Sequence, residues 1–356
     1  ELNPGFAEAY SNLGITLNDL GKSQEEFDCY VKATELDPNL PNIFQSITRF
    51  LRDSDLSKLN KLKLKHILNQ LLEKNDVPHR ELFKAFNFLY KKDIINSLER
   101  FKSDSSKEEN LKLFIKDKTV LNAIKKITFR DFQLETILTN VRKYICNRIN
   151  KNKEGISESQ LEFIIALGEQ CFLNEYIYSQ TEEENLSLDI IINRCINGEI
   201  NETNISILSC YFPLYKLIKQ IPSLKSFISS NQSFRELIRL QITEPLKEIQ
   251  LSQRIKKLGS INDYISKKVK SQYEENPYPR WRYGSNLGVK KVFITQVINN
   301  EIRPNSIKQN IDDTQLNVLV AGCGTGNHIL HTQIYKNAKI TAIDLSLSSL
   351  AYAQRK

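Results

Sequence analysis

Residues 318–328 form the stretch VLVAGCGTGNH, a short apolar run followed by three glycines that alternate with other residues. The β-branched run at 317–321 predicts a strand buried on both faces. Ile329, Leu330 and Ile334 then recur at helical spacing. The order of strand, glycine turn and helix is typical of α/β folds that hold a ligand at the turn.

A second unit of the same kind follows directly. Residues 339–343 predict another strand, which ends in Asp344, and Ser346 is placed to cap a following helix. A strand–helix–strand crossover implies parallel pairing. Asp344 lies 18 residues beyond Gly326, at the strand end where a carboxylate accepts both hydroxyls of a ribose. The pattern therefore predicts a site for an adenosine-like ligand.

The spacing of the glycines separates the possible ligands. A nicotinamide dinucleotide fingerprint is G-x-G-x-x-G, and Asn327 stands at the position of its third glycine. The observed G-x-G-x-G at 322–326 favours S-adenosylmethionine, which has no pyrophosphate to accommodate. No Gly-Lys-Ser/Thr follows, so a phosphate-cradling P-loop is excluded.

VLVAGCGTG at 318–326 together with ITAIDLSLSSLAYAQRK at 340–356 resembles the start of a class I S-adenosylmethionine-dependent methyltransferase domain. By that resemblance Asp344 binds the ribose hydroxyls and Leu345 flanks the adenine. Ala321 stands where many relatives carry an acidic residue, and His328 is a candidate to orient substrate or cofactor. The resemblance implies a cofactor site made of Gly322, Cys323, Gly324, Gly326, Asp344 and Leu345, with the catalytic residues unassigned.

The beginning of the chain contains a repeat boundary. ELNP at 1–4 returns as ELDP at 35–38, 34 residues later. Residues 1–41 resemble one tetratricopeptide repeat, and the motif positions are Tyr10, Leu13, Gly14, Leu17, Gly21, Phe27, Tyr30, Ala33 and Pro38. Gly14 and Ala33 are expected where the two helices approach closely. Glu26 replaces a small residue, so we expect a looser helix contact there or a side chain rotated outward.

Residues 42–270 predict an all-helical region, because apolar residues recur at spacings of three and four without strand alternation. Ser157 and Ser187 are predicted helix N-caps. At Tyr273 the composition of the chain changes. Residues 273–284 read YEENPYPRWRYG, and the prolines of this segment forbid a regular helix. This segment is expected either as a linker pinned to the surface by aromatic packing or as a substrate-facing lid, with Tyr278, Arg280 and Trp281 as its candidate residues.

The wider chain resembles a bacterial family that joins tetratricopeptide repeats to such a methyltransferase domain, through residues 161–184, 211–217 and 272–281. The fold expected is mostly α, with a repeat helix pair at 1–41, helices at 42–270 and the first β-α-β-α portion of a Rossmann-like domain at 271–356. The expected function is methyl transfer, with repeats that bind a protein or peptide partner. A scaffold with a degenerate domain and a different nucleotide enzyme are the alternatives.

We also expect the chain to be a fragment truncated at both ends, because such a sheet usually has more strands and such repeats come in arrays. Residues 1–356 alone are then expected to bind S-adenosylmethionine poorly and to be inactive.

Composition and charge limit the class of protein, the location and the partners that can be expected. The chain has 356 residues, of which 40% are hydrophobic and 26% charged, and a net charge of +8. No apolar run is long enough to cross a membrane and no signal-peptide pattern is present, so a cytoplasmic location is predicted. Six scattered cysteines and four histidines predict neither a disulfide framework nor a metal site. The lysine clusters are expected to be solvated helix faces, with a surface for an acidic partner as the alternative. Nucleic acid is the less favoured partner.

Overall fold

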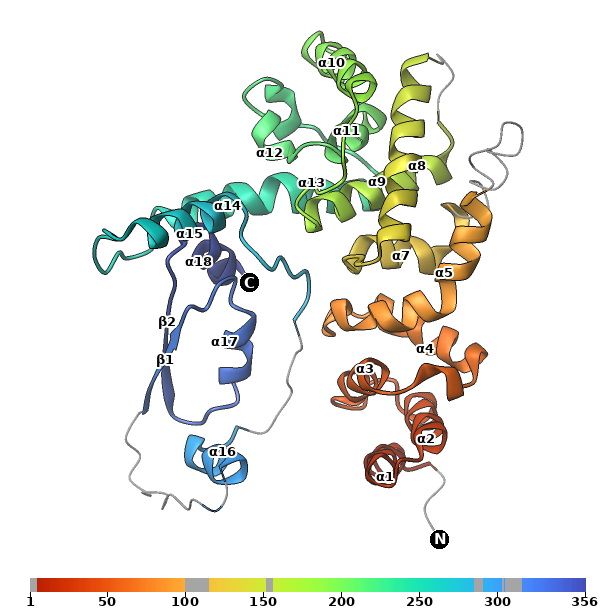
Figure 1. Cartoon of the computed structure of the whole chain (residues 1–356), viewed down its shortest axis with the longest axis vertical. Helices are drawn as coiled ribbons and strands as arrows, with labels where there is room; N and C mark the ends of the chain where they lie inside the picture. The colour runs from red at the N-terminus through yellow and green to blue at the C-terminus, as the bar shows by residue number, and fades with distance from the viewer. Residues whose placement is uncertain (1–4, 100–114, 152–155, 285–290, 303, 305–315) are drawn as a thin grey trace. The chain divides into compact units, whose positions relative to one another are not determined.

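The computed structural model is mostly helical, with one two-stranded parallel sheet among the residues that it describes. The chain divides into two compact units, Glu1–Leu246 and Lys247–Lys356. The first unit is helical and the second carries the sheet (Figure 1). The predicted domain boundaries at 41 and 270 stay predictions. The structure describes residues 5–99, 115–151, 156–284, 291–302, 304 and 316–356.

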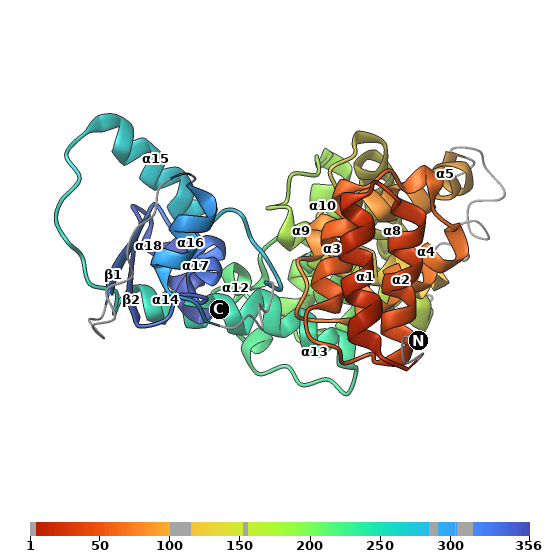
Figure 2. The same cartoon turned by 90° about the horizontal axis from the view of Figure 1, so that it is seen from below.

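The helices of the first unit pack mainly against close neighbours in the sequence, such as α1 against α2, α2 against α3, and α9 against both α7 and α11. Figure 2 shows α1, α2 and α3 as adjacent helices at the beginning of the chain. A π-helix at Arg239–Thr243 leads into α14 (Glu244–Ser252), and the boundary between the two units falls within α14 along the chain. The other helices are α1 (Ala7–Asp19), α2 (Ser23–Leu36), α3 (Ile43–Asp53), α4 (Lys61–Glu73), α5 (Phe83–Glu99), α7 (Lys118–Lys126), α8 (Phe132–Lys151), α9 (Glu158–Leu173), α10 (Glu182–Ile196), α11 (Glu202–Ser209), α12 (Leu214–Leu217) and α13 (Gln232–Ile238), with short 3-10 turns at Leu56–Lys58, His79–Leu82 and Pro222–Lys225.

The α1–α2 pair has the close approach expected at its glycine. A Cβ added to Gly14 would lie 2.6 Å from the ring of Tyr30, so only glycine fits there without movement. Phe27 and Ala33 are fully buried between the helices and their neighbours. The expectation of an outward Glu26 is wrong. Its side chain is buried, and its carboxylate accepts hydrogen bonds from the Asn18 amide at 3.1 Å.

Two helix starts in this unit test the predicted caps. Ser157 caps α9 as expected, and Gln160 completes a capping box with it. Ser187 is not a cap, because it lies buried inside α10. The cap of α10 is Thr181, whose hydroxyl accepts from the Glu184 backbone while the Glu184 carboxylate accepts from the Thr181 backbone. The reciprocal bonds satisfy two N–H groups that would otherwise lack partners.

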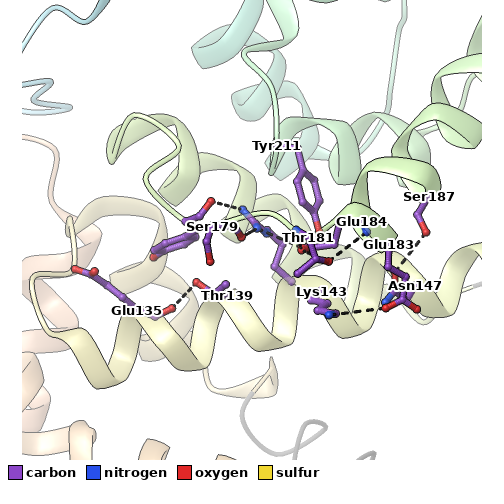
Figure 3. A network of polar contacts seen from close by, with 12 residues as sticks. Glu135, Thr139, Lys143, Asn147, Ser179, Thr181, Glu183, Glu184, Ser187 and Tyr211 are labelled. Atoms are coloured by element: carbon purple, nitrogen blue, oxygen red, sulfur yellow. Dashed lines mark hydrogen bonds and ion pairs between the residues drawn. The ribbon is translucent and has the colours of Figure 1, made fainter.

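A buried ion pair ties α8 to α10. The Arg142 guanidinium lies 3.3 Å from the Glu184 carboxylate, and both side chains are almost completely buried. The same arginine donates to the Ser179 carbonyl at 2.5 Å, and the Tyr211 hydroxyl donates to Glu184 at 2.7 Å (Figure 3). The Tyr211 ring also lies 4.2 Å from the guanidinium. Each charge is therefore compensated, as the burial of charged groups requires.

The second unit contains the predicted sheet. β1 and β2 pair in parallel, from Leu316 opposite Ala338 to Ala321 opposite Ile343. Figure 1 shows the two strands side by side with α17 between them in the chain. Ser346 caps α18 as expected, since its hydroxyl accepts from the Ser349 backbone. The elements are α15 (Tyr264–Glu275), α16 (Ile294–Glu301), β1 (Leu316–Ala321), α17 (Asn327–Thr332), β2 (Ala338–Ile343) and α18 (Leu347–Arg355).

The expectation that the first strand is buried on both faces is wrong. Its side chains alternate between exposed and half-buried, and Leu319 is 61% exposed. Within the described residues β1 has a single hydrogen-bonded neighbour strand, β2. Among the same residues, no helix has both the length and the apolar character needed to cross a membrane.

Candidate functional site

The loop at 322–326 joins the end of β1 to the start of α17. Its three glycines have positive φ angles, 67° at Gly322, 52° at Gly324 and 87° at Gly326. Residues with a Cβ rarely adopt this conformation, so the alternating glycines explain how the chain makes the turn. The Cys323 N–H donates to the Ile343 carbonyl at 3.1 Å and anchors the loop to the end of β2.

Asp344 follows β2 directly and faces this loop. Its Oδ2 accepts a hydrogen bond from the Gly324 N–H at 2.8 Å, and its Oδ1 accepts from the Ser346 N–H at 2.9 Å. The residue is half-buried. An ionised carboxylate offers about four lone-pair directions, so each oxygen keeps acceptor capacity for a ligand. The structure thus brings the predicted carboxylate and the predicted loop together at one edge of the sheet.

The three glycines differ in their surroundings. Among the residues that the structure describes, a Cβ at Gly322 would meet no atom within 4 Å, and one at Gly324 would meet only the Tyr278 carbonyl oxygen at 3.8 Å. A Cβ at Gly326 would lie 2.7 Å from the Cβ of Ala353 in α18. Gly322 and Gly324 therefore border open space, whereas Gly326 permits helix packing.

The other predicted cofactor residues have contrasting exposures. Cys323 is buried, and burial together with the nearby Asp344 raises the pKa of its thiol. Leu345 is 43% exposed beside Asp344, and His328 is exposed on α17. A thiol with a raised pKa stays protonated at neutral pH and is a poor nucleophile. Cys323 can therefore shape the loop, but this environment does not activate it.

Residues 273–284, which we call the strap, lie against the glycine loop. The Thr325 hydroxyl donates to the Pro279 carbonyl at 2.7 Å, and the Trp281 indole N–H donates to the Thr325 carbonyl at 3.0 Å. Thr325 is almost completely buried. A single threonine thus bonds to the strap through both its side chain and its backbone, which fixes the two segments to each other.

The strap is also held by α18. The Tyr352 hydroxyl accepts from the Trp281 N–H at 3.1 Å and donates to the Trp281 carbonyl at 2.5 Å, and the rings pack edge to face. The Arg280 guanidinium lies 5.8 Å from the centre of the Tyr352 ring. Tyr278 is 58% exposed. These contacts are of the kind expected for a segment pinned by aromatic packing, and the substrate-facing role of Tyr278, Arg280, Trp281 and His328 stays a prediction.

Sequence reasoning missed Glu274. Its carboxylate accepts from the Leu347 N–H at 2.8 Å and the Ser348 N–H at 3.1 Å, at the start of α18. A negative group at a helix N-terminus satisfies free N–H groups and is stabilised by the helix dipole. The partners are 73 and 74 residues apart in the chain, and no local pattern points from one to the other.

The buried thiols of the helical unit are not activated as nucleophiles. Burial raises the pKa of Cys146 and of Cys195 to about 11, and raises that of Cys210 as well. These thiols are therefore protonated at neutral pH. Across the part of the chain that the structure describes, no three metal-ligating side chains come together.

Comparison with known proteins did not identify a relative of this chain. No protein-family model, curated protein or solved structure matches the chain.

Proposed function

We propose that the second unit binds S-adenosylmethionine at the glycine loop and belongs to a class I methyltransferase domain with a Rossmann-like sheet, whose helical partner unit recruits a protein or peptide. One observation carries the proposal. Asp344 at the end of β2 faces a loop of left-handed glycines at the end of β1, and the two strands are parallel. Ligands of parallel α/β sheets bind at this edge.

The residues fit the shape of such a ligand. The space in front of Gly322 and Gly324 lets a ligand approach the backbone, as a side chain there would not. The free acceptor capacity of Asp344 suits two adjacent ribose hydroxyls. Leu345 offers an exposed apolar side chain for one face of an adenine ring.

S-adenosylmethionine supplies a methyl group on a sulfonium, which already has a good leaving group. The contribution of this chain is then to bind and orient. Asp344 fixes the ribose, the Gly322–Gly324 backbone sets the distance of closest approach, and the strap keeps the loop in place through Thr325. Holding reactants in line is itself a large part of the catalysis of a transfer reaction.

Equilibrium calorimetry with S-adenosylhomocysteine and with NADH tests the proposal. We expect the protein to bind S-adenosylhomocysteine and not NADH. Asp344→Ala should weaken that binding by about 10- to 100-fold, the scale of losing hydrogen bonds to a charged group. Asp263→Ala removes a carboxylate in the same unit that caps α15, and binding should be unchanged. Tighter binding of NADH would overturn the proposal in favour of a reductase, and binding of neither would favour a scaffold.

A further inference from the structure

The strap brings a backbone carbonyl to the glycine loop. A Cβ built on Gly324 would lie 3.8 Å from the Tyr278 carbonyl oxygen, and among the described residues outside the loop no other heavy atom comes within 4 Å of it. The carbonyl therefore stands at the edge of the space that Gly324 leaves open. Its position is set by the next residue, because the Pro279 carbonyl accepts from the Thr325 hydroxyl at 2.7 Å.

This carbonyl has acceptor capacity to spare. The carbonyls of Pro279 and Trp281 accept from the hydroxyls of Thr325 and Tyr352, whereas no group in the described part of the chain donates to the Tyr278 carbonyl. The peptide group that follows Tyr278 has no N–H, since the next residue is a proline, so it offers an acceptor only. The oxygen carries partial negative charge and favours a donor or a cation over an anion.

The groups around Gly324 come in a fixed order. Leu345 adjoins Asp344 in the chain, Asp344 accepts from the Gly324 N–H at 2.8 Å, and the Tyr278 carbonyl lies beside Gly324. S-adenosylmethionine has its parts in a matching order: an adenine, a ribose, and an amino acid with an ammonium and a carboxylate. With the adenine beside Leu345 and the ribose at Asp344, the amino-acid part reaches the strap.

We infer that the Tyr278 carbonyl accepts a hydrogen bond from the ammonium group of the methionine part. A charged donor makes a stronger hydrogen bond than a neutral one, and Asp344, as a carboxylate, is the better acceptor for the ribose hydroxyls. A backbone oxygen already held in place through Thr325 loses little freedom on binding. It also disfavours the carboxylate, so it fixes which way round the amino-acid end lies. The assignment rests on the proposed function, because it names a contact of the same site.

Calorimetry tests the contact from the side of the ligand. S-adenosylhomocysteine carries the ammonium and is uncharged at sulfur, and its deaminated analogue lacks only the amine. We expect deamination to weaken binding by about tenfold or more, the scale of losing a hydrogen bond to a charged group. Thr325→Val removes the hydroxyl that positions the strap, so deamination should then cost about threefold or less, since changes at one contact are not additive. Thr341→Val, at an exposed position of β2, is the matched control and should keep the full effect of deamination.

Carbonyl NMR of the unmodified protein observes the acceptor itself. The chain has one Tyr–Pro step, Tyr278–Pro279, so ¹³C at tyrosine carbonyls with ¹⁵N at prolines labels a single bonded pair. Saturating S-adenosylhomocysteine should move the Tyr278 carbonyl resonance downfield, as acceptance of a hydrogen bond does, and the deaminated analogue should not. The one Phe–Pro step, Phe212–Pro213 in the helical unit, gives a control carbonyl that should not move with either ligand.

Three results would overturn the inference while S-adenosylhomocysteine still binds: an unmoved Tyr278 resonance, an equal shift with the deaminated analogue, or equal affinity for the two ligands. Far-UV circular dichroism checks that the Thr325 and Thr341 variants are folded, and the NMR measurement needs no variant. Absence of S-adenosylhomocysteine binding would instead reject the proposed function and the contact with it, so the two failures are distinguishable.

Discussion

Asp344 accepts a 2.8 Å hydrogen bond from the backbone N–H of Gly324, twenty residues earlier in the chain. This bond joins the turn after one strand to the end of the next strand. The carboxylate is at once a structural anchor of the loop and a potential ligand for hydroxyl groups. An Asp344 variant would therefore lose binding for two reasons, a displaced loop and a missing acceptor for the ligand. A stability measurement separates the first from the second.

Asp344→Ala should destabilise the second unit by about 1–3 kcal/mol, because it leaves two backbone N–H groups without their charged acceptor. Trp281 is the only tryptophan of the chain and lies in this unit, so urea unfolding followed by its emission reports on it selectively. An emission midpoint equal to that of the unmodified protein would show that the bond contributes nothing.

Thr325→Val should destabilise the same unit by about 0.5–1.5 kcal/mol, the net value of one hydrogen bond, since the Pro279 carbonyl loses its donor. Thr325→Ser keeps the hydroxyl and should retain most of that stability. Thr341→Val is the matched control at an exposed position of β2. If Thr325→Val and Thr341→Val shift the urea midpoint equally, the strap is not held through this hydroxyl.

The parallel strand pair was predictable because its signals are local. The strands were expected at 317–321 and 339–343, and the structure has them at Leu316–Ala321 and Ala338–Ile343. The apolar runs set the strands and the glycines set the turn. Strand burial was not predictable in the same way, because it depends on what lies beside and above the strand, which the run itself does not encode.

The contacts that hold the site could not be predicted, because they join segments far apart in the chain. The Trp281 indole bonds to Thr325 across 44 positions, and Glu274 bonds to the start of α18 across 73. The N-cap of α10 was predicted wrongly for a different reason. Ser187 suits a cap by residue type, but Thr181 precedes three consecutive glutamates and one of them closes the capping box.

Arg142→Met should destabilise the helical unit by about 3–5 kcal/mol, because it leaves the Glu184 carboxylate buried without its cation. The double variant Arg142→Met with Glu184→Met should recover part of that loss, since no charge then remains buried. Unfolding in urea followed by far-UV circular dichroism measures both. Lys143→Met is the matched control, because Lys143 pairs with Glu183 at the surface and such pairs contribute about 0–1 kcal/mol. Equal losses for Arg142→Met and Lys143→Met would contradict the expectation.

Glu26 should make the α1–α2 pair dependent on pH. Burial raises the pKa of this carboxyl above its ordinary value of 4.5, and the hydrogen bond from Asn18 only partly opposes that shift. The folded state therefore binds the proton more tightly than the unfolded state does. The resulting stability is fully present below the unfolded pKa and is lost as pH rises through the folded pKa.

Glu26→Gln should remove this dependence and stabilise α1 and α2 at neutral pH, because an amide is not charged and its oxygen can still accept from Asn18. Hydrogen–deuterium exchange of peptides from these two helices, between about pH 4 and about pH 8 and corrected for the intrinsic exchange rate, measures the local stability. Glu25→Gln is the control, since Glu25 is exposed and pairs with Lys22 at the surface, and it should leave the profile unchanged. Protection that instead increases with pH in the unmodified protein would mean that Glu26 is stabilised as the carboxylate.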